Sequence, residues 1–216
     1  MKQFAVIGCG RFGSAVAKTL YKNGYDVLAI DENPDIIQYI SEHVTHSASL
    51  DVKDENALKA VGMRNIDVAI IAIGSEIKAS IMATLVVKEL GVKYVVAKAQ
   101  DELHAKVLYK IGADRVIFPE RDMGVRLAYN LTSTNILDYI ELAPDYSIME
   151  IVAPDRWVNK TLEETDVRAK YGISVLAIKH GEAINVSPKA QEIVQMGDVL
   201  VVVGANEDLQ RVQEKV

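Results

Sequence analysis

The sequence predicts an α/β fold in which a Rossmann-like doubly wound parallel sheet is followed by a smaller α+β C-terminal lobe. Three observations predict it. Strand-like apolar runs alternate with helical patterns in the first part of the chain, three glycines follow the first run, and the pattern changes after about Asp138. Such alternation is typical of parallel sheets, because each parallel connection needs a crossover. We therefore predict a nucleotide-binding domain at residues 1–136 and a C-terminal domain at residues 137–216.

The expected elements of the first domain follow one another in alternation. Apolar runs predict strands at 3–7, 26–30, 46–50, 67–73, 93–98 and 114–118. Helical spacing and helix-starting residues predict helices at 11–22, 34–43, 55–61, 78–90 and 102–112. Strands separated by helices in this way are what a doubly wound parallel sheet requires.

The second domain has a different sequence pattern. The stretches DYIEL and SIMEIV alternate polar and apolar residues, as half-buried strands do, and GISVLAI, AINV and GDVLVVVG follow with turn residues between them. A short helix is expected at 206–215. The connection RLAYNLTSTNILDYI contains no Gly/Ser-rich or Pro-rich linker, so we expect the two domains to be coupled rather than freely tethered.

Composition argues against several classes of protein. The chain has 216 residues, a formal net charge of −6 and no Lys/Arg-rich run, which argues against a nucleic-acid partner. Its one cysteine, Cys9, cannot form an internal disulfide, which suits a reducing cytosol. The N-terminus lacks a signal-peptide pattern, and no apolar run approaches the roughly 18 residues of a membrane span. We expect a cytoplasmic protein that could still serve a membrane partner.

The glycines in AVIGCGRFG have the spacing of a nucleotide-binding loop. Gly8 permits a tight turn out of the first strand, Gly10 lets a phosphate approach the backbone, and Gly13 lets the following helix pack against the sheet. The helix N-terminus then offers free N–H groups and a positive dipole end to phosphates. The alternative is a glycine-rich turn without a ligand, which the flanking strand and helix disfavour.

Two charged positions narrow the ligand class. Asp31 ends the second strand and can accept hydrogen bonds from both ribose hydroxyls, while Glu32 beside it would repel the 2′-phosphate of NADP. Arg11 at the start of the helix would suit terminal phosphates, as in ADP or ATP, through charge-assisted hydrogen bonds. A solvent-facing Arg11 paired with a carboxylate is the alternative.

No arrangement of residues indicates catalysis. A dehydrogenase needs an acid, base or metal beside the nicotinamide, and the second domain offers one histidine, His180, which we expect on the surface at a strand end. His104 is expected on an exposed helix face near Glu102. No Cys or His residues have metal-ligand spacing. The sequence therefore predicts a protein that is not an enzyme.

Several longer stretches carry a resemblance to a known family. They are AVIGCGRFG, LAIDENP, AIG followed by KAS, KAQ, KIGADRVIFPERDMG, VRAKYGISVLAIK and GDVLVVVG. Together they resemble the RCK-type (regulator of conductance of potassium) cytosolic subunits of Ktr and Trk potassium-uptake systems, and most closely KtrA-like members. The resemblance implies a gating subunit that dimerises and assembles, typically as an octameric ring, at the inner face of the cell membrane beneath a potassium transporter. ATP and ADP would favour different ring shapes and so regulate potassium flux.

The resemblance also assigns roles to residues of the first domain. The phosphates would be held by Gly8, Gly10, Arg11, Phe12 and Gly13, with Arg11 reaching the terminal ones. Asp31 would bind the ribose. The pocket would be completed by Asp51, Val52, Ile73, Gly74 and Lys98, the first two near the adenine. Glu120 would help to bind an activating divalent cation, Mg²⁺ or Ca²⁺, across the dimer. From the residues alone, Glu120 after Pro119 is instead a helix N-terminal carboxylate that the dipole stabilises.

In the second domain the resemblance implies a cyclic di-AMP site at a symmetric dimer interface. Arg168 would approach a phosphate and His180 would assist, while apolar contacts to the adenines would come from Ile173, Ile178 and Pro188. Without the resemblance, Ile173 and Ile178 are strand core and Arg168 is a surface charge.

Two departures from the family pattern bear on nucleotide preference. Glu76 stands where an asparagine is often found, and Val52 stands where a small residue is often found. An NAD(H)-responsive regulator of the same fold remains an alternative, and a small NAD-dependent oxidoreductase is a weaker one.

Overall fold

The computed structural model describes residues 2–132, 136–143 and 145–214. Contacts between residues divide the chain into two compact units, Met1–Glu120 and Arg121–Val216. This division falls within a helix that the predicted boundary at residues 136 and 137 places wholly in the first domain. The chain thus forms two units, and the predicted boundary between residues 136 and 137 stays a prediction.

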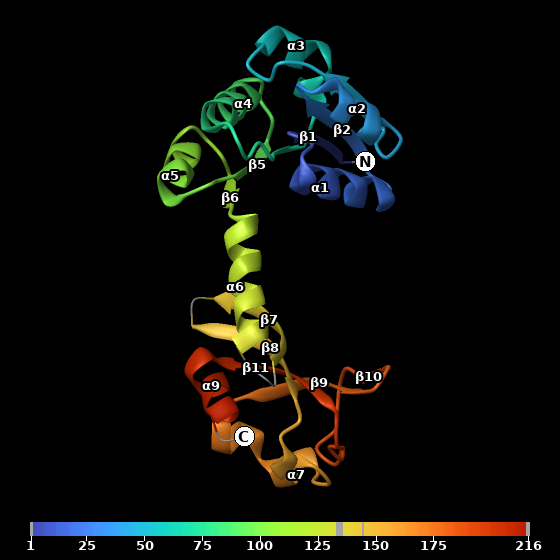
Figure 1. The fold of residues 1–216 in the computed structure, drawn as a ribbon, viewed down its shortest axis with the longest axis vertical. Coiled ribbons are helices and arrows are strands. Elements are labelled where there is room, and N and C mark those ends of the chain that lie inside the picture. Colours follow the sequence, from blue (N-terminus) through green and yellow to red (C-terminus); the bar gives the residue numbers. More distant parts are fainter. Residues whose placement is uncertain (1, 133–135, 144, 215–216) are drawn as a thin grey trace. The chain divides into compact units, whose positions relative to one another are not determined.

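The first unit is built on a parallel six-stranded sheet (Figure 1). Its strand order is β3-β2-β1-β4-β5-β6, the doubly wound order, in which the chain reverses direction across the sheet between β1 and β4. The strands are β1 (Gln3–Ile7), β2 (Asp26–Asp31), β3 (His46–Ser49), β4 (Val68–Ile71), β5 (Tyr94–Lys98) and β6 (Arg115–Ile117). The predicted Rossmann-like fold is confirmed.

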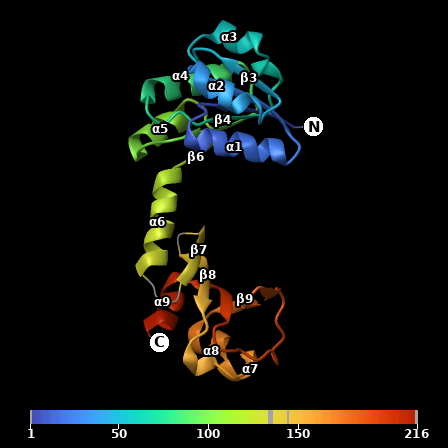
Figure 2. The ribbon, with the colours of Figure 1, turned by 45° about the vertical axis from the view of Figure 1, so that its right-hand side comes forward.

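Helices cover both faces of this sheet (Figure 2). They are α1 (Arg11–Lys22), α2 (Pro34–Ser41), α3 (Glu55–Ala60), α4 (Ile77–Glu89) and α5 (Glu102–Lys110). Successive β1 residues point to opposite faces, so Val6 packs with α1 and α2 whereas Ala5 and Ile7 pack with α3, α4 and α5. A short 3₁₀ helix, Met63–Asn65, precedes β4.

The second unit contains an antiparallel five-stranded sheet in the order β10-β9-β11-β8-β7. Its strands are β7 (Ile136–Ala143), β8 (Tyr146–Val152), β9 (Ser174–His180), β10 (Ala183–Asn185) and β11 (Val199–Ala205). The helices are α6 (Pro119–Thr132), which begins in the first unit, α7 (Leu162–Thr165), α8 (Val167–Tyr171) and α9 (Asn206–Glu214), with a 3₁₀ helix at Asp155–Trp157. The predicted α+β lobe is confirmed, although α7, α8 and the 3₁₀ helix were not expected.

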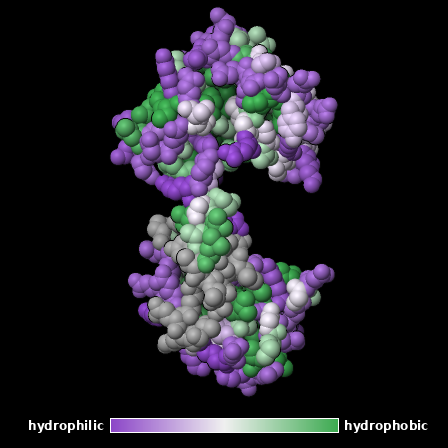
Figure 3. All heavy atoms as spheres, in the orientation of Figure 1, coloured by the Kyte–Doolittle hydropathy of each residue, from purple (hydrophilic) through white to green (hydrophobic). Residues whose placement is uncertain are grey.

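The core of the second unit lies on one face of its sheet. Burial in β8 alternates along the strand, as the sequence predicted, and α8 and α9 contribute Val167 and Leu209 to the same cluster as Trp157. Hydrophobic side chains also reach the surface, and Figure 3 shows them along α6 and over parts of this sheet. Among the helices of the described residues, none combines the length and apolar character needed to cross a bilayer.

Candidate functional site

The glycine loop between β1 and α1 has the geometry that its spacing predicts. Gly8 has φ of +89°, and a Cβ there would lie 2.9 Å from the Ile73 backbone nitrogen. A Cβ on Gly13 would lie 1.9 Å from the Gly8 carbonyl oxygen, whereas a Cβ on Gly10 would meet no heavy atom within 4 Å. Two glycines are therefore required by packing, and Gly10 leaves open space beside the backbone.

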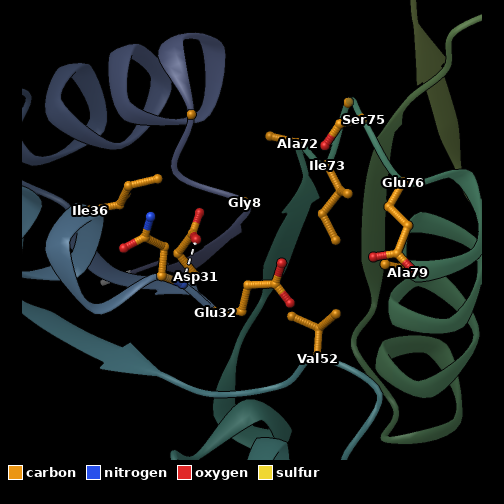
Figure 4. Close-up of a pocket in the computed structure, with 13 residues that line it drawn as sticks. Gly8, Asp31, Glu32, Ile36, Val52, Ala72, Ile73, Ser75, Glu76 and Ala79 are labelled. Atoms are coloured by element: carbon orange, nitrogen blue, oxygen red, sulfur yellow. Dashed lines mark hydrogen bonds between the residues drawn. The ribbon is translucent and has the colours of Figure 1, made fainter.

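That open space belongs to a cleft of about 320 Å³ at the carboxyl ends of β1, β2 and β4 (Figure 4). Ligands of open α/β sheets bind at this edge, where the strand order reverses. The cleft is lined by Gly8, Gly10, Asp31, Glu32, Asn33, Ile36, Val52, Ala72, Ile73, Gly74, Ser75, Glu76 and Ala79. Six of the predicted site residues are thus brought together: Gly8, Gly10, Asp31, Val52, Ile73 and Gly74.

Asp31 is held in place by the backbone. Its Oδ2 accepts the Cys9 N–H at 2.7 Å and its Oδ1 accepts the Asn33 N–H at 2.9 Å. A carboxylate offers about four acceptor positions, so both oxygens keep capacity for a ligand. The arrangement fixes the carboxylate at the end of β2, where a ribose is held in dinucleotide-binding folds.

The N-terminus of α1 faces this loop without a side-chain cap. Gly10 is its N-cap residue, and the first turn contains no acidic residue. The first N–H groups of a helix have no intrahelical acceptor, so this end can receive an anion. Arg11 begins α1 and is exposed, while the Phe12 ring is half-buried against the core shared with α2. Phe12 can therefore contribute its backbone to an anion, but its side chain packs into the core.

Lys98 and Glu120 form an ion pair beside the cleft. The Lys98 side chain is 11% exposed and that of Glu120 is 71% exposed. The Lys98 hydrogen bond is the main cause that lowers the pKa of Glu120, with smaller contributions from the charges of Lys98 and Arg11. Since a Cβ on Gly74 would lie 3.0 Å from Lys98 Nζ, the pair lies against the loop between β4 and α4.

The metal role expected of Glu120 stays a prediction. Within the described residues, no three His, Cys, Asp or Glu side chains are grouped as a cation site would require. The Glu120 carboxylate already has Lys98 as its partner. A cation at Glu120 would therefore need ligands beyond the described residues of one chain, as the expected site across a dimer implies.

Asp51 lies next to the cleft rather than among its lining residues. Its side chain accepts the Lys53 N–H at 2.9 Å and lies 3.8 Å from Lys53 Nζ, so it stabilises the turn after β3. Val52 is buried and does line the cleft.

The side chains of Cys9 and His104 are both buried in the first unit. The Cys9 thiol is buried beneath the glycine loop, and burial raises its pKa to about 12. His104 is only 3% exposed, so the expectation of an exposed helix face is wrong. Its Nδ1 accepts the Gln100 N–H at 3.3 Å, and burial lowers its pKa. Gln100 in turn donates through its side chain to the Gly74 carbonyl, which ties this segment to the loop that lines the cleft.

In the second unit the residues that the cyclic di-AMP assignment groups differ in their exposure. Ile173 and Ile178 are both 0% exposed and belong to the sheet core. Neither side chain has accessible surface in this conformation, and their role as adenine contacts stays a prediction. Arg168 on α8 is exposed and Pro188 is half-buried, so both remain accessible.

His180 ends β9 as expected, but it has acidic partners. Its Nδ1 lies 2.7 Å from Asp198 Oδ1, and its Nε2 lies 3.6 Å from Glu192 Oε1. Asp198 is buried and also accepts the Gln195 N–H at 2.6 Å. His180 is therefore part of a polar network that fastens the loop before β11, in contrast to the isolated surface residue that we expected.

Comparison with known proteins assigns the family. Residues 4–119 match the TrkA-N domain and residues 147–216 match the TrkA-C domain. The chain is 46% identical over 215 residues to Ktr system potassium uptake protein C of Bacillus subtilis, covering 100% of this chain and 97% of that protein. The chain belongs to the KtrA-like family of RCK regulatory subunits. Its identity to the Ktr system potassium uptake protein A is 44% for B. subtilis and 39% for Vibrio alginolyticus, with at least 94% of each chain covered.

Solved structures agree on the fold of this KtrA-like chain. The GsuK RCK domain superposes with a TM-score of 0.70 at 16% identity, covering 99% of this chain and 47% of that one. The GsuK channel bound to NAD gives a TM-score of 0.68 at 16% identity, covering 96% of this chain and 38% of that one. At these identities the likeness shows the shared fold alone.

Several cleft residues were not predicted as site residues. Asn33, Ile36, Ser75 and Ala79 line the cleft, and Asn33 also caps α2 by accepting the Asp35 N–H. A usable signal existed for Asn33, Ile36 and Ser75, because each lies two to five residues after the end of β2 or β4, at the edge where ligands bind. Ala79 lies in α4 and carried no such signal. Glu76 was noted as a departure from the family pattern, and the structure places it in the cleft wall.

Proposed function

We propose that this chain is the cytosolic gating subunit of a Ktr-type potassium-uptake system, in which ATP or ADP in the first-unit cleft sets the conformation of an RCK assembly. The observation that carries the proposal is the open space at Gly10, beside an uncapped helix N-terminus and a carboxylate fixed at the end of β2. This combination accepts a phosphate chain and a ribose, and no catalytic step is required of it.

The response to ATP and ADP must arise near the third phosphate, since the two ligands share everything else. A ligand shifts a conformational equilibrium only as far as it prefers one state. The charges available at this end are Arg11, Lys98 and Glu120, and Arg11 is close enough to Glu120 to help lower its pKa. We propose that these groups discriminate the two nucleotides.

Assembly is the second part of the proposal. We propose a homodimer that builds a ring, an octamer by family resemblance, on the inner face of the membrane beneath a potassium-transporter subunit. The relatives named above are subunits of Ktr uptake systems. Exposed hydrophobic side chains on α6, such as Met123, Leu127 and Leu131, support burial of this helix against another chain.

The discriminating test is calorimetric titration of wild type and Arg11→Ala with ATP and ADP. The substitution is expected to weaken ATP about tenfold more than ADP, because only ATP carries the phosphate that Arg11 reaches. Lys22→Ala is the matched control, since it removes the same charge from the other end of the same helix. Equal losses for both nucleotides would remove Arg11 as the discriminator.

A divalent cation, Mg²⁺ or Ca²⁺, is proposed to act with ATP through Glu120. Its other ligands would be nucleotide phosphates and a second copy of the chain, since the described residues of one chain contain no cluster of three such side chains. Glu120→Gln should reduce the effect of the cation on ATP affinity and leave binding without cation largely intact. An unchanged cation response would reject this role.

Cyclic di-AMP binding in the second unit remains a proposal that rests on the accessible Arg168 and Pro188, with His180 as an assisting residue. Arg168→Ala should weaken binding of cyclic di-AMP to the purified chain by about tenfold or more, because a guanidinium–phosphate contact is charge-assisted. Glu163→Ala, on neighbouring α7, is a control that should not weaken it. Identical affinities for wild type and Arg168→Ala would end the assignment.

NAD(H) is a second candidate for the first-unit cleft. Asp31 suits it as well as ATP, because the adenosine half of NAD presents the same ribose, and the GsuK channel bound to NAD has the same fold. Competition of ATP, ADP and NADH for one site separates the candidates. If ATP displaces NADH only at concentrations far above the Kd of ATP for the free protein, NAD(H) is the favoured ligand.

A further inference from the structure

Glu76 places a carboxylate on the wall of the cleft. It is the N-cap residue of α4, yet its side chain does not cap that helix. It lines the cleft and is exposed, and within the described part of the chain its carboxylate makes no hydrogen bond or ion pair. Its two oxygens are therefore available to a ligand.

The position of Glu76 corresponds to the base end of a bound nucleotide. Phosphates would lie at Gly10 and the ribose at Asp31. Figure 4 shows Glu76 and Ala79 on the wall opposite Asp31 and Glu32, with Ile73 and Val52 between the walls. These apolar side chains offer flat contact to a base, and Glu76 lies at the edge of that surface.

The chemistry of this edge differs between bases. An ionised carboxylate is an acceptor only, and the lining of the cleft contains no Lys, Arg or His to offset Asp31, Glu32 and Glu76. The pairing edge of guanine presents two adjacent donors, N1–H and the 2-amino group, which match a carboxylate in a bidentate manner. The same edge of adenine presents one donor, the 6-amino group, beside the N1 acceptor, which a carboxylate oxygen repels.

We propose that Glu76 sets the base selectivity of this cleft and extends its ligands to guanine nucleoside di- and triphosphates, which bind at least as tightly as ADP and ATP. This inference rests on the proposed nucleotide site and concerns only which base that site accepts. An amide at position 76 would present one acceptor and one donor, which match adenine instead.

The experiment compares Kd values of ADP, GDP and inosine diphosphate for wild type and Glu76→Gln by calorimetry on the full chain. Wild type should bind GDP at least as tightly as ADP, and inosine diphosphate, which lacks the 2-amino donor, more weakly than GDP. Glu76→Gln should shift the ratio of GDP to ADP affinity about tenfold toward ADP. Glu32→Gln, the matched acid-to-amide change near the ribose, should leave the ratio unchanged.

The outcomes separate this inference from the function on which it rests. If both nucleotides bind and the ratio is the same in wild type and Glu76→Gln, the base selectivity assigned to Glu76 is wrong and the nucleotide site stands. If wild type prefers ADP over GDP by tenfold or more, the inference is also overturned. If wild type binds neither nucleotide, the proposed function itself fails, and the inference fails with it.

Discussion

The residues that the family resemblance assigns to ligand sites have very different surroundings in the two units. In the first unit the predicted positions meet around a cleft, and much of what they offer is backbone: free N–H groups, a positive φ at Gly8 and open space at Gly10. In the second unit two of the five predicted positions, Ile173 and Ile178, are sheet core, and His180 belongs to a polar network. Sites built from backbone geometry are thus easier to infer than sites built from apolar side chains, which serve equally well as core.

The largest expected effect tests the glycine loop. Gly13→Ala would place a Cβ 1.9 Å from the Gly8 carbonyl oxygen, so it should destabilise the first unit by more than about 3 kcal/mol and abolish nucleotide binding. Thermal unfolding and calorimetry measure the two effects. Gly10→Ala is the matched control, since its Cβ meets nothing in the free protein: it should fold normally and lose only phosphate binding. A Gly13→Ala variant that melts like wild type would contradict the loop geometry.

The next effect tests the second unit. Ile178→Ala should leave a cavity in the core and cost about 3 kcal/mol of unfolding free energy. Ile184→Ala on β10, where the side chain is 54% exposed, should cost less than about 0.5 kcal/mol. Chemical denaturation of both variants measures the difference. If Ile178→Ala kept full stability but lost cyclic di-AMP binding, Ile178 would act as a ligand contact and not as core.

A smaller effect concerns the pH dependence of the first unit. Burial lowers the pKa of His104 in the folded state, so folding favours the neutral imidazole, and the nearby Asp101 opposes this only partly. This contribution is complete above the unfolded pKa of about 6.5 and is lost as pH falls through that value toward the lowered folded pKa. The melting temperature should therefore fall between pH 7 and pH 5 more steeply in wild type than in His104→Gln. Equal slopes of melting temperature against pH in the two proteins would contradict this role of His104. The control is His46→Gln, at an exposed position, which should retain the wild-type slope.

The smallest effect concerns the ion pair beside the cleft. Lys98→Met keeps the apolar stem of the side chain and should cost less than about 1 kcal/mol, because Glu120 is largely exposed. It should also raise the pKa of the Glu120 carboxyl, since the Lys98 hydrogen bond is the main cause that lowers it. NMR titration of that carboxyl in both proteins measures the change. A pKa that does not rise would show that the pair does not form in solution.

Much of the fold could be predicted because the local signals agreed with one another. The helix predicted at 11–22 has those bounds, and the six predicted strands form the sheet in doubly wound order. Gly13 was predictable for a physical reason, since only a glycine permits the approach of α1 to the β1 loop.

Other features were harder to predict because they depend on tertiary packing. The pairing of β9 with β11 shifts register between Val201 and Val202, so that Leu176 is skipped in the pairing. This irregularity interrupts the alternation of buried and exposed side chains along β9. Ile173 and Ile178, which regular alternation would place on opposite faces, are therefore both buried. His104 did carry a signal, since it lies four residues before the buried Leu108 on the same helix face. The partners of His180 come from a distant loop, and no local pattern indicated them.

Hydrogen–deuterium exchange of the full chain with and without ATP tests the central claim most directly. ATP should slow exchange at the amides of residues 8–14 and 72–79, which form the glycine loop, the start of α1 and the opposite wall of the cleft. Unchanged exchange in both segments at saturating ATP would contradict a nucleotide site in this cleft.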